Sequence, residues 1–572
     1  MKGPFSLLSL YRRKFKQMVL FFSIFTSWTL PQYSVADQLV ILHTNDHHGH
    51  YIQDPKQRIF GMAARKTLID KLKGTAKTEG KSVLLLSGGD INTGTPESDF
   101  FDAEPDFRAM NMMGYDAMSI GNHEFDNPFK VLLKQQSWSK FPFLAANIYY
   151  SKGKKKFNSS VHRDKDRPFK PYMVKMVGDK KVLIVGLTTE ETAKFTKVKD
   201  VIFRPALEEA KTLLPKLNRE IKPDLTVALT HLGYFVAGMH RGFPADFSLA
   251  KNLGKKHLDI IVGGHTQKAL VEPHVVNGVA IVQAGEWGKY LGKMEVKLLG
   301  NRKYKISSYS LLGVNYKAVS SDFARREDVQ NIRKVKNMVV KEDPKVSSYL
   351  RNFYKKYPVK LDEAFATIDS DFDGRGRGRG KETNLGRLVS HSICYITHGD
   401  ICFFNNGGLR IDLNKGTITR RDILALMPFN NELCHVKIKT KELVGYLEKI
   451  YKATKYRSTH FSGVRFSVVG DKIKELYVNI EKGNPSLIPN NSLKKVYSNG
   501  KVLKDQLFDI ASTCFLTRGR DGYPNMEKVE THKKYGINAG IEYRDSLVFI
   551  DFLKQKKNVL GKEYSVDTIQ SK

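Results

Sequence analysis

The chain has 572 residues, 41% of them hydrophobic, which is sufficient for two large domains that each have a core. Its formal net charge of +35 at pH 7 favours anionic substrates and anionic envelope surfaces as binding partners. The lysines and arginines are dispersed along the sequence and form no recognisable module, which argues against a nucleic-acid-binding protein.

The first 36 residues have the pattern of a signal peptide. Four basic residues between positions 12 and 16 precede an apolar stretch of 13 residues, Met18 to Leu30, and the small residues Ser34-Val35-Ala36 follow. The apolar stretch is short for a membrane span, which needs about 20 residues. We expect cleavage after Ala36 and a periplasmic or secreted mature chain without a membrane span. The pair Arg12-Arg13 leaves the twin-arginine export route open beside the general one.

Between Asp37 and about Leu298, short apolar runs alternate with helix-length amphipathic stretches, as is typical of an α/β domain. The runs expected to form strands are Leu39–Leu42, Val83–Leu86, Met118–Ile120, Phe143–Ala146, Val182–Val185, Leu225–Leu229 and Ile260–Val262.

Polar side chains that are able to bind metals follow five of these runs. Because the carboxyl ends of parallel strands open on one crevice, we expect these side chains to meet there. Neighbouring glycines allow the backbone and a substrate to approach closely. The five groups are Asn45-Asp46-His47-His48, Gly88-Gly89-Asp90, Gly121-Asn122-His123-Glu124, Thr230-His231 and Gly263-Gly264-His265-Thr266-Gln267.

The mixture of carboxylate, imidazole and amide ligands suits Zn²⁺, Mn²⁺ or Co²⁺ better than Mg²⁺ or Ca²⁺. Seven candidate ligands exceed what one ion normally takes from a protein, so two ions are predicted. Asp90 is the natural shared carboxylate and would hold the ions about 3.5–4 Å apart. The nearby His43, His47 and His50 are expected to be structural or to support the ligands from behind.

The sequence becomes strongly charged between about Asn301 and Leu361, and its apolar residues predict a connecting helix near Pro344–Tyr357. A second mixed domain follows, with a helix at Asn384–Thr397, and the alternating text of Gly374–Gly380 predicts a flexible basic loop. Further strands are expected near Ile401–Phe404 and Cys434–Ile438. The expected division is 37–340 for the metal domain, 341–362 for the linker helix, 363–552 for the second domain and 553–572 for a tail.

The four cysteines, Cys394, Cys402, Cys434 and Cys514, all lie in the C-terminal third. An even number of cysteines in an exported chain permits disulfides, with three possible connectivities. Their apolar neighbours instead favour buried free thiols.

Three stretches resemble motifs of a known family: Ile41 to His50, Gly121-Asn122-His123-Glu124, and Gln283 to Gly288. The chain resembles the metallophosphoesterases, and specifically the bacterial periplasmic UDP-sugar hydrolase/5′-nucleotidase family, over nearly all of 37–552. The resemblance implies an α/β protein with an N-terminal four-layer α/β/β/α domain, a linking helix and a second, smaller α/β nucleotide-binding domain.

The same resemblance implies that Asp46, His48, Asp90 and Gln267 bind one ion, and that Asp90, Asn122, His231 and His265 bind the other. It implies that His123, supported by Asp126, stabilises the transition state and does not bind metal. A carboxylate three residues away is able to orient the imidazole and keep it cationic.

Substrate contacts in the second domain are also implied by the resemblance. Phe429 and Phe515 match a pair of base-stacking aromatics, worth about 1–3 kcal/mol per stacked base, and Asp521 matches the acid that holds ribose hydroxyls. The other implied contacts are a base-contacting amide, a backbone contact and three arginines with phosphate-binding geometry: Asn431, Gly463, Arg375, Arg379 and Arg410.

The sequence departs from the family pattern at two places. Arg377 is a third arginine in the Arg-Gly loop. The match of Arg375 and Arg379 to the two arginines of the family could therefore be shifted by two residues. Arg518 and Arg520 stand before Asp521 where the family tends to have smaller residues, and they are candidates for added affinity toward a diphosphate.

Together these features predict a monomeric exported hydrolase that cleaves phosphate ester or pyrophosphate bonds of AMP-type nucleotides and UDP-sugars in nucleotide catabolism. Two ions would polarise the phosphoryl oxygens and lower the pKa of a water, whose hydroxide attacks phosphorus in line with the leaving group. One alternative is a 2′,3′-cyclic-nucleotide 2′-phosphodiesterase/3′-nucleotidase, which shares both domains and the metal set. The other is a non-catalytic nucleotide-binding or surface protein.

Overall fold

The computed structural model describes residues 37–54, 56, 59–196, 198–235, 239–240, 243–319, 330–374, 382–454, 459–479, 493–535, 543–564 and 569–571. The expected signal peptide, residues 1–36, lies outside these ranges, as do Arg375 and Arg379. Among the described residues, no helix combines the length and the apolar composition that a membrane crossing requires.

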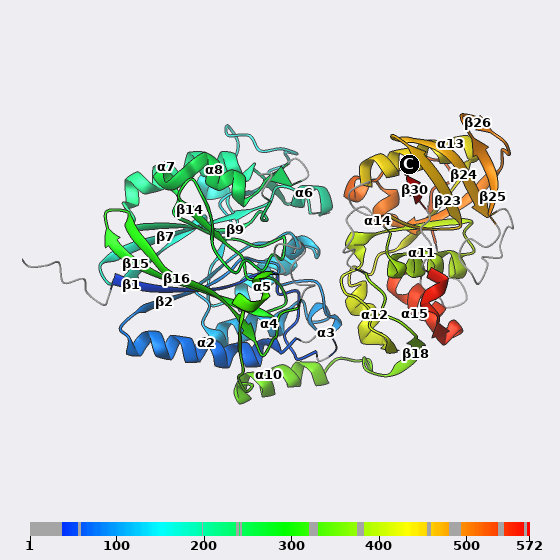
Figure 1. The fold of residues 1–572 in the computed structure, drawn as a ribbon. Helices are drawn as coiled ribbons and strands as arrows, with labels where there is room; N and C mark the ends of the chain where they lie inside the picture. Colours follow the sequence, from blue (N-terminus) through cyan, green and yellow to red (C-terminus); the bar gives the residue numbers. More distant parts are fainter. Residues whose placement is uncertain are drawn as a thin grey trace, which may run out of the picture.

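Two β-sheets face each other in the N-terminal domain (Figure 1). The first sheet has the order β17-β16-β15-β1-β2-β3-β4, and the second has the order β13-β14-β12-β9-β7-β6. The strands of the first are β1 (Gln38–Thr44), β2 (Ser82–Ser87), β3 (Ala117–Ser119), β4 (Phe143–Leu144), β15 (Tyr290–Gly300), β16 (Lys303–Val314) and β17 (Lys336–Met338). Those of the second are β6 (Tyr172–Val177), β7 (Lys180–Thr188), β9 (Leu225–His231), β12 (Ile260–Val262), β13 (His274–Val276) and β14 (Val279–Val282).

Helices cover the outer face of each sheet. In β1, Leu39 and Ile41 pack toward the second sheet, whereas Val40 and Leu42 pack toward the helices, because successive side chains of a strand point to opposite faces. Both faces are therefore apolar, as expected for a sheet covered on both sides. The covering helices are α2 (Gly61–Thr78), α4 (Glu104–Met113) and α5 (Phe129–Trp138) on the first sheet, and α7 (Ala206–Ile221) and α8 (Asp246–His257) on the second.

This arrangement confirms the four-layer α/β/β/α domain. All seven expected strands are present, and their ends differ from the expected ones by at most three residues. Strands β1 to β4 pair in parallel, as do β7, β9, β12 and β14. The carboxyl ends of these strands consequently lie at one edge of each sheet.

The connecting helix is α10 (Pro344–Lys355). The carboxylate of Asp343 caps it by accepting a hydrogen bond from Val346 N at 2.9 Å. Val346 and Leu350 are buried in the same core as α2 and α4, so this helix packs on the N-terminal domain before the chain crosses to the second domain.

The described part of the second domain contains three sheets, ordered β22-β19-β27-β21-β28, β26-β25-β24-β23-β30 and β20-β18-β29. The expected helix at Asn384–Thr397 is α11, and the expected strands are β19 (Ile401–Asn405) and β21 (Leu433–Lys439). The other helices are α12 (Arg420–Leu426), α13 (Thr440–Thr454), α14 (Cys514–Thr517) and α15 (Asp545–Lys556). The other strands are β18 (Ala364–Ile368), β20 (Gly416–Thr419), β22 (Thr459–Ser462), β23 (Val464–Val469), β24 (Lys472–Asn479), β25 (Leu493–Ser498), β26 (Lys501–Val502), β27 (Leu507–Thr513), β28 (Lys533–Lys534), β29 (Asn558–Val559) and β30 (Ile569–Ser571).

The expectation of a tail at 553–572 is wrong. Leu553, Val559 and Tyr564 are buried in the core of the second domain. Strand β29 pairs with β18, and β30 pairs with β23. These residues are integrated because their apolar side chains and their backbone both find partners inside the domain.

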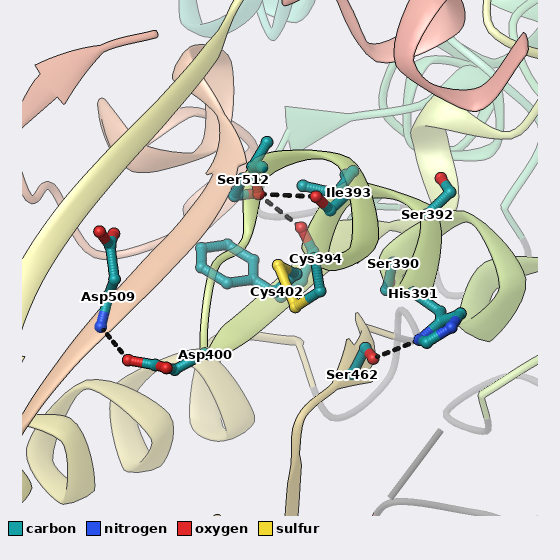
Figure 2. The surroundings of a disulfide bond; sticks show 12 residues. Ser390, His391, Ser392, Ile393, Cys394, Asp400, Cys402, Ser462, Asp509 and Ser512 are labelled. Atoms are coloured by element: carbon teal, nitrogen blue, oxygen red, sulfur yellow. Dashed lines mark hydrogen bonds between the residues drawn. A yellow bond between two sulfur atoms is a disulfide. The ribbon is translucent and has the colours of Figure 1, made fainter. Parts of the chain in front are cut away.

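The preference for free thiols is also wrong, because the structure joins Cys394 to Cys402 and Cys434 to Cys514. The first pair links α11 to β19, the strand that follows it (Figure 2). The second pair links β21 to the residue after its antiparallel partner β27. An apolar neighbourhood did not discriminate between the two states, since a buried disulfide occupies the same kind of core as a buried thiol.

Ion pairs connect the two domains where α12 lies against α3 (Pro96–Asp99). Nη1 of Arg421 donates to the buried Glu97 carboxylate at 2.7 Å, and Lys56 Nζ lies 2.8 Å from Asp422 Oδ2. Because an unpaired buried charge is costly, the Glu97 carboxylate would be strongly destabilising without this guanidinium. The contacts therefore favour the domain arrangement seen in Figure 1.

We predict that the two disulfides stabilise the fold unequally. Cys434–Cys514 closes 80 residues and Cys394–Cys402 closes 8. By loop-closure entropy, replacing the first pair by alanines costs roughly 2 kcal/mol more free energy of unfolding than replacing the second pair. Chemical denaturation of both variants measures this difference. Thiol titration of the unmodified chain, denatured without a reductant, is the check on the pairing itself. Four reactive thiols would contradict it.

Candidate metal centre

The loops that leave the two sheets meet at one edge of the N-terminal domain. Gly88 follows β2 of the first sheet, whereas Gly263 and Gly264 follow β12 of the second. A Cβ on Gly88 would lie 2.7 Å from the carbonyl oxygen of Gly263, and one on Gly264 would lie 2.7 Å from that of Gly88. Only glycine permits this approach, which brings the polar residues of both sheets together.

Backbone conformation turns the candidate ligands inward. Five of the seven have a positive φ: Asp46 (51°), His48 (51°), Asp90 (55°), His265 (74°) and Gln267 (55°). Left-handed backbone is uncommon for residues other than glycine and concentrates at functional sites. Hydrogen bonds fix these turns: the N–H of Asp46 donates to Gly89 O at 2.9 Å, and that of His48 donates to Asp90 O at 3.0 Å.

All seven candidate ligands come together around Asp90. One group comprises His48, Asp90 and His123, and a second comprises Asp90, His231 and His265; within each group the ligand atoms lie within 4.8 Å of one another. Asp90 belongs to both groups, as expected of a shared carboxylate. The remaining ligands join these groups: Asp46 Oδ1 lies 3.9 Å from His48 Nε2, Gln267 Nε2 lies 3.0 Å from His48 Nε2, and Asn122 Oδ1 lies 2.8 Å from His265 Nδ1.

The imidazoles are oriented from behind. His48 Nδ1 lies 2.8 Å from the carbonyl oxygen of Thr93, and His231 Nδ1 lies 2.6 Å from that of Gly88. Each ring therefore directs Nε2 into the site, where His231 Nε2 lies 3.0 Å from Asp90 Oδ2. Backbone carbonyls commonly orient metal-binding histidines in this way.

The chemistry of this donor set fits divalent cations. The Asp46 side chain is buried, and its Oδ1 has no hydrogen-bond partner within the described residues. Burial raises the pKa of Asp46 to about 7. Burial also opposes ionisation of Asp90, but the neighbouring His231 and His123 hold the pKa of Asp90 well below its usual range. A buried cluster of carboxylates and imidazoles with inward-facing atoms is what a divalent ion requires.

His123 and Asp126 form a pair at the edge of this cluster. Asp126 Oδ2 lies 2.6 Å from His123 Nδ1 and accepts a hydrogen bond from Thr93 Oγ1 at 2.8 Å. Burial lowers the pKa of His123, but the carboxylates of Asp126 and Asp90 outweigh burial and raise it above its ordinary value. The arrangement suits a cationic hydrogen-bond donor beside the candidate ligands.

Supporting residues that the sequence analysis did not assign surround the cluster. The buried carboxylate of Glu124 accepts hydrogen bonds from the backbone N–H groups of Asp90, Ile91, Asn92 and Gly121, and so fixes the turn that carries Asp90. Glu191, after β7, has Oε2 3.7 Å from His265 Nε2. The side chain of Asn45 donates to Asp46 Oδ2 at 2.7 Å. The sequence signal for Asn45 and Glu124 was their place in the polar groups that follow the strands, and Glu191 had none.

Three further histidines lie outside both groups, as expected. His47 Nε2 lies 2.9 Å from Asp106 Oδ1, and the ring of His50 stacks on Trp287 with centroids 4.6 Å apart. His43 is buried, with Nε2 3.4 Å from the hydroxyl of Tyr309.

Two of the expected substrate residues reach the metal domain. The Phe429 ring stacks on His123 with centroids 5.8 Å apart, and Cζ of Arg410 lies 5.7 Å from the centre of the Phe429 ring. Both side chains therefore face the candidate metal centre from the second domain.

The other four described substrate residues have different surroundings. Asn431 Nδ2 donates to Asp545 Oδ2 at 3.1 Å, and Asp521 Oδ2 accepts from Asn405 Nδ2 at 2.9 Å. Phe515 is half-buried against a core of the second domain that includes Val436 and Ile510. Gly463 has φ +77°, and a Cβ there would lie 2.0 Å from the carbonyl oxygen of Asp400, so the backbone itself requires glycine. A structural role therefore accounts for both residues: the side chain of Asn431 binds Asp545, and the backbone at position 463 requires glycine.

Comparison with known proteins agrees with both halves of the fold. Residues 39–269 match the family model of the calcineurin-like phosphoesterases, and residues 364–528 match that of the 5′-nucleotidase C-terminal domain. The chain is 36% identical to a 5′-nucleotidase of Vibrio parahaemolyticus over 555 residues, which cover 92% of this chain and 91% of the relative. It is 34% identical to the protein UshA of Escherichia coli strain K12 over 528 residues, which cover 88% of each.

A solved structure shares the fold across both domains. The 5′-nucleotidase precursor from Thermus thermophilus superposes with a TM-score of 0.72 at 24% identity, covering 93% of this chain and 99% of that one. The sequence identities to the relatives, which extend over nine-tenths of the chain, together with the metal-ligand chemistry of the site, decide the assignment. The chain belongs to the 5′-nucleotidase family of metallophosphoesterases and is a metal-dependent hydrolase of nucleotide phosphoesters.

Proposed function

We infer that this protein is an exported two-metal 5′-nucleotidase and UDP-sugar hydrolase. The observation that carries the inference is the shared position of Asp90 in both groups, one of which also includes His123 of the His123–Asp126 pair. In this proposal the N-terminal residues 37–340 form the metal domain and the residues from 363 onward bind the nucleotide. The signal-peptide pattern of residues 1–36 supports export to the periplasm or beyond.

Two divalent ions, which we propose to be Zn²⁺, Mn²⁺ or Co²⁺, would be held by two sets of residues that share Asp90. When bound, such ions polarise phosphoryl oxygens and supply hydroxide at neutral pH. The first set is Asp46, His48, Asp90 and Gln267, and the second is Asp90, Asn122, His231 and His265.

The chain's own residues supply positioning and charge. His123 donates a hydrogen bond to the charge that develops on the phosphoryl group or the leaving oxygen, and Asp126 keeps its imidazole oriented and protonated. Arg410 and Phe429 hold the nucleotide against this pair, because both face His123. Phe515 and Asp521 complete the proposed nucleotide contacts, stacking the base and binding the ribose hydroxyls, and Arg375 and Arg379 extend the proposed phosphate contacts.

Substrate preference separates this proposal from its rivals. Metal-stripped protein resupplied with Zn²⁺, Mn²⁺ or Co²⁺ is expected to release phosphate from AMP directly and from UDP-glucose after added phosphatase. Preference for 2′,3′-cyclic AMP or 3′-AMP would select the 2′,3′-cyclic-nucleotide 2′-phosphodiesterase/3′-nucleotidase. Binding without turnover under every metal would select the non-catalytic protein.

Replacing His123 by alanine is predicted to lower kcat for AMP by about 10²- to 10⁴-fold, because the general acid or charge-stabilising donor is lost. Metal content is expected to stay at the level of the unmodified protein, since His123 is not a proposed ligand. His257→Ala, on the distant end of α8, serves as the control and is expected to retain full activity. Loss of metal from His123→Ala would assign this histidine to an ion instead.

Metal uptake is predicted to release protons. Burial lowers the pKa of His231, but the Asp90 carboxylate outweighs burial and raises it to about 10. In the metal-free protein His231 is therefore protonated at pH 7, whereas a metal ligand must be neutral, so affinity should rise with pH until about pH 10. Calorimetry of Mn²⁺ binding in buffers of different ionisation enthalpy measures the release. An identical binding enthalpy in all buffers would contradict it, and His231→Gln should reduce the dependence.

A further inference from the structure

A cavity of about 430 Å³ lies between the two domains, beside the proposed nucleotide site. The N-terminal domain lines it with Glu191 and with Lys194 and Phe195 of α6 (Thr192–Phe195). The second domain lines it with the loop Arg518–Gly522, which follows α14. Figure 1 shows α6 on the side of the first domain that faces the second. The volume falls in the range of small-molecule sites.

The cavity is rich in cations for its size. Lys194, Arg518 and Arg520 all line it. Nη1 of Arg520 donates to the carbonyl oxygen of Lys194 at 3.0 Å and so ties the loop to α6 across the domain boundary. A guanidinium carries five N–H donors in a fork that matches phosphate oxygens, and a lysine ammonium adds a point charge.

The two acids of the cavity are turned toward other partners. Oε2 of Glu191 lies 3.7 Å from Nε2 of His265, and Oδ2 of Asp521 accepts from Nδ2 of Asn405 at 2.9 Å. These partners orient the two carboxylates but do not neutralise them. Three cations against two carboxylates leave the lining with a formal excess of one positive charge, and Nε of Arg518 also lies 3.1 Å from Oε1 of Glu527.

The same contacts place the cavity next to the reaction site. Through Glu191 it adjoins His265, a proposed metal ligand. Through Asp521 it adjoins Asn405 at the end of β19, from which the chain runs directly to Arg410 beside Phe429. A nucleotide held by the proposed contacts would consequently have this cavity within reach of its other substituents.

We propose that this cavity is a subsite for a second phosphate group of the nucleotide, bound by Lys194, Arg518 and Arg520. The inference rests on the proposed function and adds to its substrate class nucleotides that carry a second phosphate besides the scissile one. The second phosphate comes either from the ribose, as in adenosine 3′,5′-bisphosphate, or from the phosphate chain, as in ADP. It is held by charge-assisted hydrogen bonds and is not itself attacked. A ribose phosphate is untouched by the reaction, whereas the second phosphate of ADP departs with the bridging oxygen and its electron pair.

Calorimetric titration of the full-length, metal-loaded protein tests the subsite. A His123→Ala background suppresses turnover, and AMP, ADP and adenosine 3′,5′-bisphosphate are the ligands. Adding Arg520→Gln is expected to weaken binding of at least one doubly phosphorylated nucleotide by about tenfold while changing that of AMP by less than about twofold. If only the bisphosphate loses affinity, the subsite binds a phosphate on the ribose. If only ADP loses affinity, it binds the second phosphate of the phosphate chain.

Lys194→Gln separates charge from the domain contact, because it removes the ammonium but keeps the carbonyl oxygen that accepts from Arg520. Lys194→Gln is expected to weaken the binding of the same nucleotides as Arg520→Gln. Arg219→Gln, exposed on α7, is the matched control and should change nothing. The subsite would be overturned if both variants weakened the binding of AMP as much as that of the doubly phosphorylated nucleotides. It would also be overturned if neither variant weakened the binding of any of them. AMP hydrolysis by the chain with His123 intact reports on the proposed function separately.

Discussion

The buried carboxylate of Asp90 is the element on which the rest of the site depends. It belongs to both groups of candidate ligands, and its left-handed backbone at φ 55° is held by Glu124, which accepts from the N–H of Asp90. Such a conformation is costly for a residue with a Cβ and persists where the surrounding structure over-determines it. Glu124 provides that support by binding four N–H groups of the two loops that meet there. The turn, and not the ligands alone, creates the shared position.

Two large units have to meet precisely at this turn for the chemistry to occur. The glycines at 88 and 264 let loops from two separate sheets touch, so a residue with a side chain at either position would move the candidate ligands of one sheet away from those of the other. On a larger scale, the Arg421–Glu97 ion pair and the Arg520–Lys194 hydrogen bond hold the second domain against the first. The stacking of Phe429 on His123 follows from that arrangement. The second domain, which carries the proposed nucleotide contacts, is therefore positioned by these polar contacts and by the apolar side chains of Ile59 and Trp287, which pack in its core.

Much of the fold was readable from the sequence because strands covered on both faces are continuously apolar and end abruptly in polar loops. The seven strands were found for this reason, and α11 was found from the helical spacing of its apolar residues. The candidate ligands followed from the convergence of strand ends. The sequence could not show which polar residues are buried behind the ligands. Glu191 looks like an ordinary surface acid until the fold encloses it, and Glu124 stood in a candidate group without an assigned role. The Cys434–Cys514 pair and the packed residues after 552 depended on contacts between distant segments, which local apolar context does not encode.

Metal stoichiometry tests the central claim, that one buried carboxylate serves two ions. Elemental analysis of the purified chain is predicted to give two divalent ions per molecule, with Asn122→Ala retaining one because Asn122 belongs to only one set of ligands. Asp90→Ala is predicted to lose both ions, while circular dichroism shows that it remains folded. One ion in the unmodified chain, or an Asp90→Ala variant that keeps two, would contradict the account.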